Sequence, residues 1–395
     1  MSFLSLGFVL LVLSTAVLMW STRGALRVVG FLVASGYFVY TYVGVRGMAS
    51  TLVFCLAGFV CVYFVRRYPK WLWLAVTALT AAFVYARNYS FLGLILPEGL
   101  RANVVATVGL SFLFFKILHV VIDTAGGTIT PSLWRYLSYC LNFTTFLLGP
   151  IQRYQHFESQ WNGITEAIPA TFEAHLDAVN RVLRGLVKKY VVAEYLAAYA
   201  LQPDAPVETM SLLDLQLATY LFYIFLYFDF SGYCDIVIGA GCLLGVRPPE
   251  NFNLPFLASN PSQYWLRVHE SLTRWLTDYI FNPLYAATLR SRSLGGHPLA
   301  SITLAVMVTM LVAGLWHGTT VNFILFGLVH GIYLVVFRWY DYAALEILGR
   351  KGLQRLRSSR SWLVASTVMT FHFTATAYIL FVLDIDRLWR ILERF

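Results

Sequence analysis

Residues 299–318 read LASITLAVMVTMLVAGLWHG, and residues 321–339 read VNFILFGLVHGIYLVVFRW. Each apolar run is close to the roughly 17–25 residues that a membrane-spanning helix needs, so His317 lies at the edge of, or inside, a membrane-embedded region. An imidazole is costly there unless it is hydrogen-bonded, paired or solvated. Histidine is also well suited to moving a proton near neutral pH. This stretch by itself predicts a structural histidine and a functional one equally well.

The composition extends the membrane interpretation to the whole chain. Of 395 residues, 58% are hydrophobic and 12% are charged, whereas a soluble domain carries about 25% charged residues. The chain cannot bury that much apolar surface by itself, so we predict a polytopic membrane protein surrounded by lipid. The net charge of +9 is explained by Lys and Arg in cytoplasmic connectors facing anionic lipid, and we expect no nucleic-acid partner.

The five cysteines lie within apolar stretches, at Cys55, Cys61, Cys140, Cys234 and Cys242. None has the spacing of zinc ligands beside histidines, so they indicate small buried residues and no metal site. The sequence also lacks a Walker loop, a Rossmann glycine fingerprint, a His-Glu-x-x-His motif and a Ser-centred nucleophile elbow. We therefore expect no bound cofactor.

Twelve apolar segments are candidate membrane spans. They lie near residues 3–20, 25–43, 48–65, 71–87, 103–122, 134–149, 179–201, 212–228, 230–246, 299–316, 321–340 and 362–383. The first is an uncleaved span rather than a signal peptide, because its first cation, Arg23, follows the apolar run. The basic connectors 66–70 and 350–360 should face the cytoplasm. Strict alternation allows this only if 134–149 or 230–246 is not a full span, which leaves about eleven spans.

Two segments differ from simple spans in composition. Residues 171–195 carry cations such as Arg181 and Arg184 opposite an apolar face. This pattern indicates either a basic amphipathic helix at the cytoplasmic interface or the snorkelling end of an ordinary helix. Residues 247–260 are rich in Pro, Asn and Phe and cannot form a regular helix. Such backbone near a membrane has to be covered by protein or solvated in a cavity.

Residues 261–280 are too polar to span a membrane. Asn260 is a good N-cap and Pro261 suits the first helical position. The spacing predicts one short helix with Trp265 and His269 on one face and alternating charges on another. We expect this helix to pack inside the protein or along the membrane plane, with His269 beside aromatic side chains.

The remaining candidates for a functional role are polar residues within apolar sequence. They are Lys116, Asp229, Asp235, His269, Asp278, Asn282 and His317. Ionisable residues in a membrane region are functional candidates. Each one taken singly is equally compatible with a structural pairing role, and the carboxylates could orient or neutralise neighbouring cations.

Several sequence blocks, in this order, resemble the membrane-bound O-acyltransferases (MBOAT), in the branch that acts on the bacterial cell envelope. The blocks are GPIQR at 149–153, YFDFSGYCD at 227–235, ENFNLPF at 250–256, WLRVHESL at 265–272, and GLWHG at 314–318 followed by HG at 330–331. The resemblance covers roughly residues 100–385. The chain departs from the family pattern at Val268, where the family usually has Trp, and at Leu266, where it usually has Arg.

The resemblance implies roles for individual residues. His317 corresponds to the catalytic residue and His269 to a second functional position. Further candidates for lining a substrate tunnel or orienting substrate are Asp229, Asp235, Asn251, Asn253, Trp265, Arg267, Asp278 and Trp316. It implies one all-α membrane domain over residues 1–395, with N-terminal helices at 1–102 and a family core at 103–385. A ring of tilted helices and short re-entrant or interfacial helices would surround a central tunnel.

The resemblance also implies a reaction. His317 would act as general base on a hydroxyl acceptor, and the acyl donor would be a cytoplasmic thioester, either acyl-CoA or an acyl-carrier protein. His269 would donate a hydrogen bond to the developing oxyanion or orient a substrate. An extracytoplasmic acceptor or an esterase-like protein would be the partner outside. We expect location in the bacterial plasma (inner) membrane as a multi-pass protein.

Three functions compete at this point. Acetyl transfer to an exported or cell-envelope polysaccharide is favoured by Asp235 and residues 250–253, which resemble the alginate O-acetylation type. D-alanyl transfer toward teichoic acid is favoured by residues 144–150 and the short chain. A transporter or channel would use the same polar residues as a path, but paired inverted halves are not evident and both His269 and His317 lie in the C-terminal half.

Overall fold

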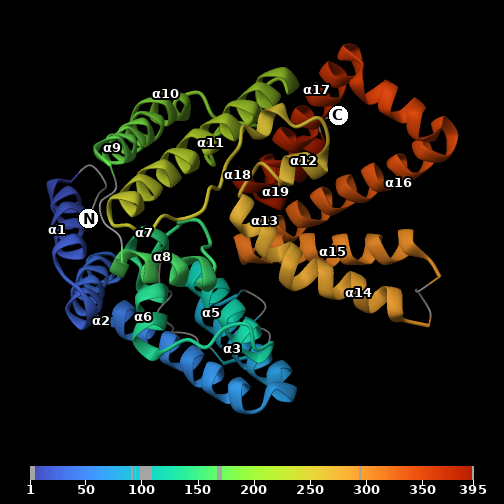
Figure 1. The fold of residues 1–395 in the computed structure, drawn as a ribbon. Helices are drawn as coiled ribbons and strands as arrows, with labels where there is room; N and C mark the ends of the chain where they lie inside the picture. Colours follow the sequence, from blue (N-terminus) through green and yellow to red (C-terminus); the bar gives the residue numbers. More distant parts are fainter. Residues whose placement is uncertain are drawn as a thin grey trace. The chain divides into compact units, whose positions relative to one another are not determined.

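The computed structural model describes residues 5–89, 92–93, 95–97, 109–166, 171–292 and 296–393, with residues 162–166 described by their backbone alone. Within these ranges every regular element is a helix (Figure 1), as expected for an all-α membrane protein. The chain forms two compact units. The first comprises Met1–Val187 and Gly232–Glu250, and the second Lys188–Ser231 and Asn251–Phe395.

The first unit contains α1 to α9 and the end of α11. The helices are α1 Leu6–Ser21, α2 Gly24–Arg67, a 3₁₀ turn Pro69–Trp71, α3 Leu72–Arg87, α5 Leu110–Ala125, α6 Leu133–Leu141, α7 Phe143–Phe146, α8 Tyr154–Glu166 and α9 Phe172–Val187. The expected span at 103–122 begins outside the described residues, and its described part is α5.

The second unit contains most of α11 and every later helix. The elements are a π-turn Lys188–Ala193, α10 Glu194–Ala197, α11 Leu212–Leu243, a 3₁₀ turn Pro255–Leu257, α12 Pro261–Trp265, α13 Glu270–Leu276, a π-turn Thr277–Phe281, α14 Asn282–Arg290, α15 Pro298–His317, α16 Val321–Ser358, α17 Arg360–Ala377, α18 Ile379–Val382 and α19 Ile385–Leu392.

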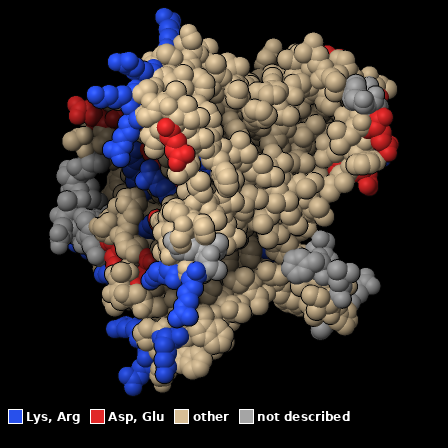
Figure 2. Space-filling model, turned by 90° about the vertical axis from the view of Figure 1, so that its right-hand side faces the viewer, with Lys and Arg blue, Asp and Glu red and all other residues tan. Residues whose placement is uncertain are grey.

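Six helical segments in the described part of the chain are long and apolar enough to cross a membrane. They are Gly24–Arg67, Pro69–Arg87, Leu212–Leu243, Pro298–His317, Val321–Ser358 and Arg360–Val382, with α1 as a shorter apolar helix. Most of the surface in Figure 2 carries neither Lys, Arg, Asp nor Glu, as expected for lipid contact. The expected count of about eleven spans is not confirmed by these segments.

The break expected between 25–43 and 48–65 is confirmed, because α2 consists of two helical segments on either side of Gly44, whose φ of 66° is non-helical. Other expected span boundaries were wrong. Residues 212–228 and 230–246 join in the single helix α11, which ends at Leu243. The expected span 179–201 is divided among α9, a π-turn and α10, since α9 ends at Val187.

Residues 134–149 form two short helices rather than a span, because buried polar groups take over the hydrogen bonds that a continuous helix would make. Lys116, which is 1% exposed, donates to the carbonyls of Tyr139 and Cys140 and to Thr145 Oγ1, the last at 3.0 Å. Asn142 Oδ1 accepts from Thr144 N at 3.1 Å and caps α7. Of the two segments considered above, 134–149 is not a single helix, and 230–246 is not a separate span because it continues α11. Lys116 has a structural role here.

In the amphipathic α9, Arg181 is paired with carboxylates of the first unit, whereas Arg184 is exposed together with apolar side chains. Arg181 Nε donates to Asp235 Oδ1 of α11 at 3.1 Å, and its two terminal nitrogens donate to the carboxylate oxygens of Glu250. Leu183 and Val187 are each 53% exposed. The exposed apolar side chains suit lipid contact, and the exposed Arg184 fits both a basic amphipathic helix at the interface and a snorkelling helix end.

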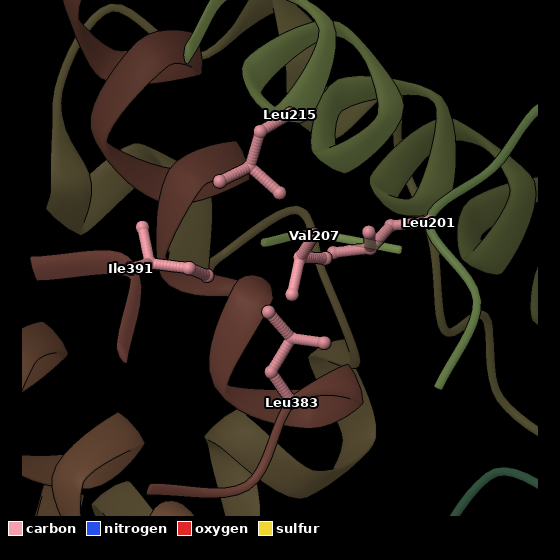
Figure 3. Packing of buried hydrophobic residues seen from close by; sticks show 5 residues of the cluster. All are labelled: Leu201, Val207, Leu215, Leu383 and Ile391. Atoms are coloured by element: carbon pink, nitrogen blue, oxygen red, sulfur yellow. The ribbon is translucent and has the colours of Figure 1, made fainter. Parts of the chain in front are cut away.

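The C-terminal helix α19 closes an apolar cluster in the second unit (Figure 3). Leu383 and Ile391 pack against Val207, Leu201 and Leu215, the last from α11. Asp384 caps α19 by accepting from Arg387 N at 2.8 Å. This helix was not predicted from the sequence, although a capping aspartate before apolar residues at helical spacing, Ile385, Leu388 and Leu392, was the available signal.

Candidate active site

The helices α15 and α16 form an antiparallel hairpin that sets the position of His317. The two helices approach each other so closely that glycine is required at two positions. A Cβ on Gly314 would lie 2.1 Å from the Phe323 carbonyl oxygen, and a Cβ on Gly327 would lie 2.3 Å from the Met310 carbonyl oxygen. At the other end, Trp339 Nε1 donates to Thr303 Oγ1 at 3.1 Å. The glycines of the GLWHG motif therefore serve packing, and the tight contact holds His317 at the end of α15.

His317 is partly exposed and surrounded by aromatic rings. Its ring centroid lies 4.7 Å from that of Trp316, 5.2 Å from Phe381 and 5.8 Å from Phe326. It is the last residue of α15, and the extended Gly318 follows. An imidazole that is partly exposed can be reached by a substrate, as a general base must be.

His269 sits in a strained turn rather than inside a helix. Its φ of 47° and ψ of 46° are left-handed, and it is the residue before α13. The expected single helix 261–280 was wrong: α12 ends at Trp265, and α13 begins at Glu270. Asn260 does cap α12, accepting from Gln263 N at 2.9 Å. Left-handed conformations of non-glycine residues concentrate at functional sites.

The irregular stretch after α11 explains why the helix breaks at His269. Asn251 O accepts from Glu270 N at 3.0 Å, and Asn251 Oδ1 accepts from Ser271 N at 3.2 Å. Asn253 N donates to Arg267 O at 2.9 Å. Residues 251–253 thus bind the backbone on both sides of His269, which replaces the helical hydrogen bonds that a continuous helix would make.

The fold brings the two expected histidines against one indole. The Trp316 ring lies 4.7 Å from that of His317 and 5.6 Å from that of His269, centroid to centroid. Phe230 of α11 contacts His269 from another side at 5.1 Å. Since 48 residues separate the histidines, their meeting is a property of the tertiary structure.

The two aspartates of the YFDFSGYCD block are in ion pairs. Asp229 Oδ1 accepts from Lys189 Nζ, and Asp235 accepts from Arg181. Both pairs join α11 to the preceding helical segment. Among the candidates for substrate contact, these two already have strong structural partners, which favours the pairing interpretation of their carboxylates.

The other candidates lie in different surroundings. Trp265 is 7% exposed, Arg267 is half-buried, and Asn253, Asp278 and Asn282 are exposed. The two positions that depart from the family pattern differ in exposure: Val268 is buried, and Leu266 is 60% exposed. Val268 therefore fills space beside His269.

A further polar aromatic group next to His317 was not singled out from the sequence. His330 of α16 is 1% exposed, and its ring stacks on Tyr264 with centroids 6.0 Å apart. Tyr264 in turn shares a hydrogen bond with Tyr378 at 2.9 Å. The His330-Gly331 pair was noted in the sequence only as a motif, and no local pattern indicates that it meets α12.

Comparison with known proteins decides the family. The MBOAT, membrane-bound O-acyltransferase model matches residues 37–344. The chain belongs to the membrane-bound O-acyltransferase family. It is an acyltransferase with several apolar membrane helices, which sets aside the transporter and channel alternatives.

The names of three curated relatives state the polymer that each acts on, which is teichoic acid, alginate or peptidoglycan. The teichoic acid D-alanyltransferase of Bacillus subtilis is 25% identical over 313 residues, covering 78% of this chain and 76% of that protein. The probable alginate O-acetylase AlgI of Pseudomonas aeruginosa is 29% identical over 296 residues, covering 74% and 52%. The peptidoglycan O-acetyltransferase of Helicobacter pylori is 33% identical over 199 residues, covering 50% and 34%. The chain spans about half the length of the alginate relative.

Proposed function

We propose that this protein transfers an acetyl group from a cytoplasmic thioester across the bacterial inner membrane to hydroxyls of a cell-envelope or exported polysaccharide. The observation that carries the proposal is the partly exposed His317 at the end of a membrane helix. The Trp316 ring contacts both this histidine and His269. The donor is acyl-CoA or an acyl-carrier protein, and an esterase-like protein could receive the acyl group outside.

The step needs one proton to move twice. A His317 ring nitrogen takes the proton of the acceptor hydroxyl while its oxygen bonds to the thioester carbonyl carbon. The resulting oxyanion needs a hydrogen-bond donor, and His269 is suited to supply one. The C–S bond then breaks, and the imidazolium of His317 returns the proton to the thiolate. The ester and the free thiol are the products, and no resident metal is required.

A D-alanyl group is the second candidate for the acyl group. The Bacillus subtilis D-alanyltransferase matches most of its own length, whereas the Pseudomonas aeruginosa acetylase matches about half. Acetyl is preferred because the aspartate and ENFN blocks resemble the acetylation type. Mass spectrometry of the hydrolysed polymer distinguishes the two esters directly.

The test replaces the chromosomal gene in its native host by variants and measures ester content of the envelope polysaccharide. His317→Ala should lower acylation by about 10²–10⁴-fold, the usual contribution of a positioned base. His297→Ala, at the opposite end of α15 and exposed, is the matched control and should keep normal acylation. Normal ester content in a folded, membrane-inserted His317→Ala variant would refute the proposal.

A further inference from the structure

The second unit contains buried polar atoms without a hydrogen-bond partner, close to His317. Neither ring nitrogen of His330 has one among the described residues, and Trp265 Nε1 also lacks one. Their rings are neighbours, with centroids 5.1 Å apart. Leaving a buried polar group unpaired is unfavourable, so these atoms indicate water or a polar ligand at this place.

The position of His330 along α16 indicates which substrate it meets. Beyond the non-helical Gly349, where φ is 65°, the far end of α16 is basic, with Arg350, Lys351 and Arg355, and the positive-inside rule places it at the cytoplasmic face. His330 lies nine residues into α16, about 13 Å along its axis, on the cytoplasmic side of the hairpin tip that carries His317. The Phe326 ring lies between the two imidazoles, 4.4 Å from His330 and 5.8 Å from His317.

The hydrogen-bonding capacity of the pair defines the ligand. Trp265 Nε1 can only donate, so it needs an acceptor such as a carbonyl oxygen. A neutral imidazole offers one donor and one acceptor, and its acceptor nitrogen needs an N–H or O–H group. An amide presents both a carbonyl and an N–H. Acyl donors built on CoA and on carrier proteins share such amides in the pantetheine arm beside the sulfur.

We propose that His330 and Trp265 form a subsite that binds an amide of the pantetheine arm and so positions the thioester at His317. This inference rests on the proposed function. The stacking of His330 on Tyr264, which is held by Tyr378, fixes the imidazole in place. His330 is thus a positioning residue that acts on the donor and takes no part in proton transfer.

The experiment compares two small donors in purified protein. S-Acetyl-N-acetylcysteamine carries the amide, and S-pentyl thioacetate replaces it with methylene groups. Wild-type kcat/KM should favour the amide-bearing donor by about 5- to 100-fold. His330→Phe, which keeps an aromatic ring, should reduce this preference at least about fivefold and leave KM for the acceptor unchanged. His330→Gln should restore part of the preference, and Val329→Ala, exposed on the same helix, should keep all of it.

The outcomes separate the two hypotheses. An equal fall for both donors in His330→Phe, or no preference in the wild type, would overturn the subsite, since the nitrogens would then hold only structural water. Trp265→Phe gives the same comparison if His330→Phe does not fold. If wild-type protein transfers acetyl from acetyl-CoA but does not prefer the amide-bearing small donor over the methylene one, only the subsite is contradicted. Protein that transfers acetyl from none of these three donors and not from an acetylated carrier protein either overturns the proposed function and the subsite together.

Discussion

At the scale of single residues, the two histidines of the site differ in how they are held. His317 ends a regular helix and keeps part of its ring exposed. His269 is 6% exposed and has a left-handed backbone that the Asn251 hydrogen bonds impose. The first arrangement suits a group that exchanges a proton with substrate. The second suits a group whose orientation matters more than its access.

We expect His269 and Asn251 to act together. His269→Ala should lower kcat, whereas His269→Asn should lower it less, because asparagine tolerates the left-handed conformation and retains a hydrogen-bonding amide. Asn251→Ala should also lower kcat, since Ser271 Oγ and N lose their acceptor. Steady-state kinetics on the three variants checks this. If His269→Ala abolishes transfer while His317→Ala does not, the base has been assigned to the wrong histidine.

At the scale of elements, the α15–α16 hairpin depends on backbone contact at glycines. Gly314→Ala should destabilise the protein by about 1–3 kcal/mol, because the added Cβ would meet the Phe323 carbonyl oxygen at 2.1 Å and a backbone atom cannot move aside cheaply. The displaced hairpin should also lose activity. The measurement is the thermal midpoint in detergent together with the transfer rate.

Gly36→Ala is the matched control for the hairpin. Gly36 lies inside α2, and a Cβ there would make an ordinary 3.5 Å contact with Met48 Cε. Alanine is the better helix former, so this variant should be as stable as the wild type or more stable. A Gly314→Ala variant with an unchanged thermal midpoint would show that the hairpin can separate without cost.

The ion pairs of α9 predict a dependence of stability on pH. The hydrogen bond from Arg181 lowers the pKa of the Glu250 carboxyl below its usual value, and Arg247 adds to this. A carboxyl whose pKa is depressed in the folded state stabilises the protein above its unfolded pKa, and this contribution disappears as pH falls through the folded value.

Glu250→Gln should therefore lower the thermal midpoint at pH 7, and the difference from the wild type should shrink as pH falls below about 4. Because the Glu250 side chain is 46% exposed, solvent screens the pair and the effect should be modest. Thermal scans at several pH values test this. A difference that stays constant across that range would mean that Glu250 contributes through packing instead of charge.

At the scale of the whole molecule, the reaction requires the two ends of the α15–α16 hairpin to face opposite sides of the membrane. Ser358 and Thr320 are exposed residues near those two ends. In intact cells, a membrane-impermeant maleimide should label Thr320→Cys but not Ser358→Cys, and inverted vesicles should give the reverse. Labelling of both positions from one side would contradict the orientation on which acyl transfer across the membrane depends.

The sequence by itself determined that this protein is all-α, that it lies in a membrane, and which family it belongs to. Composition and apolar run length decide membrane insertion, and both are local properties that need no tertiary information. The sequence blocks in their order, GLWHG among them, likewise indicated the family without a structure. The apolar runs located the break at Gly44 but not those at Asn142 and His269, which depend on hydrogen bonds to distant residues.

The tertiary structure alone decided which residues meet. The Trp316 ring contacts those of His269 and His317, and the His330 ring contacts that of Trp265. No local sequence pattern predicts contacts between residues this far apart in the chain. The physical reason is that glycine contacts between α15 and α16 and the hydrogen bonds of Asn251 set the positions of separate elements. Those interactions depend on backbone geometry reached only after the chain has folded.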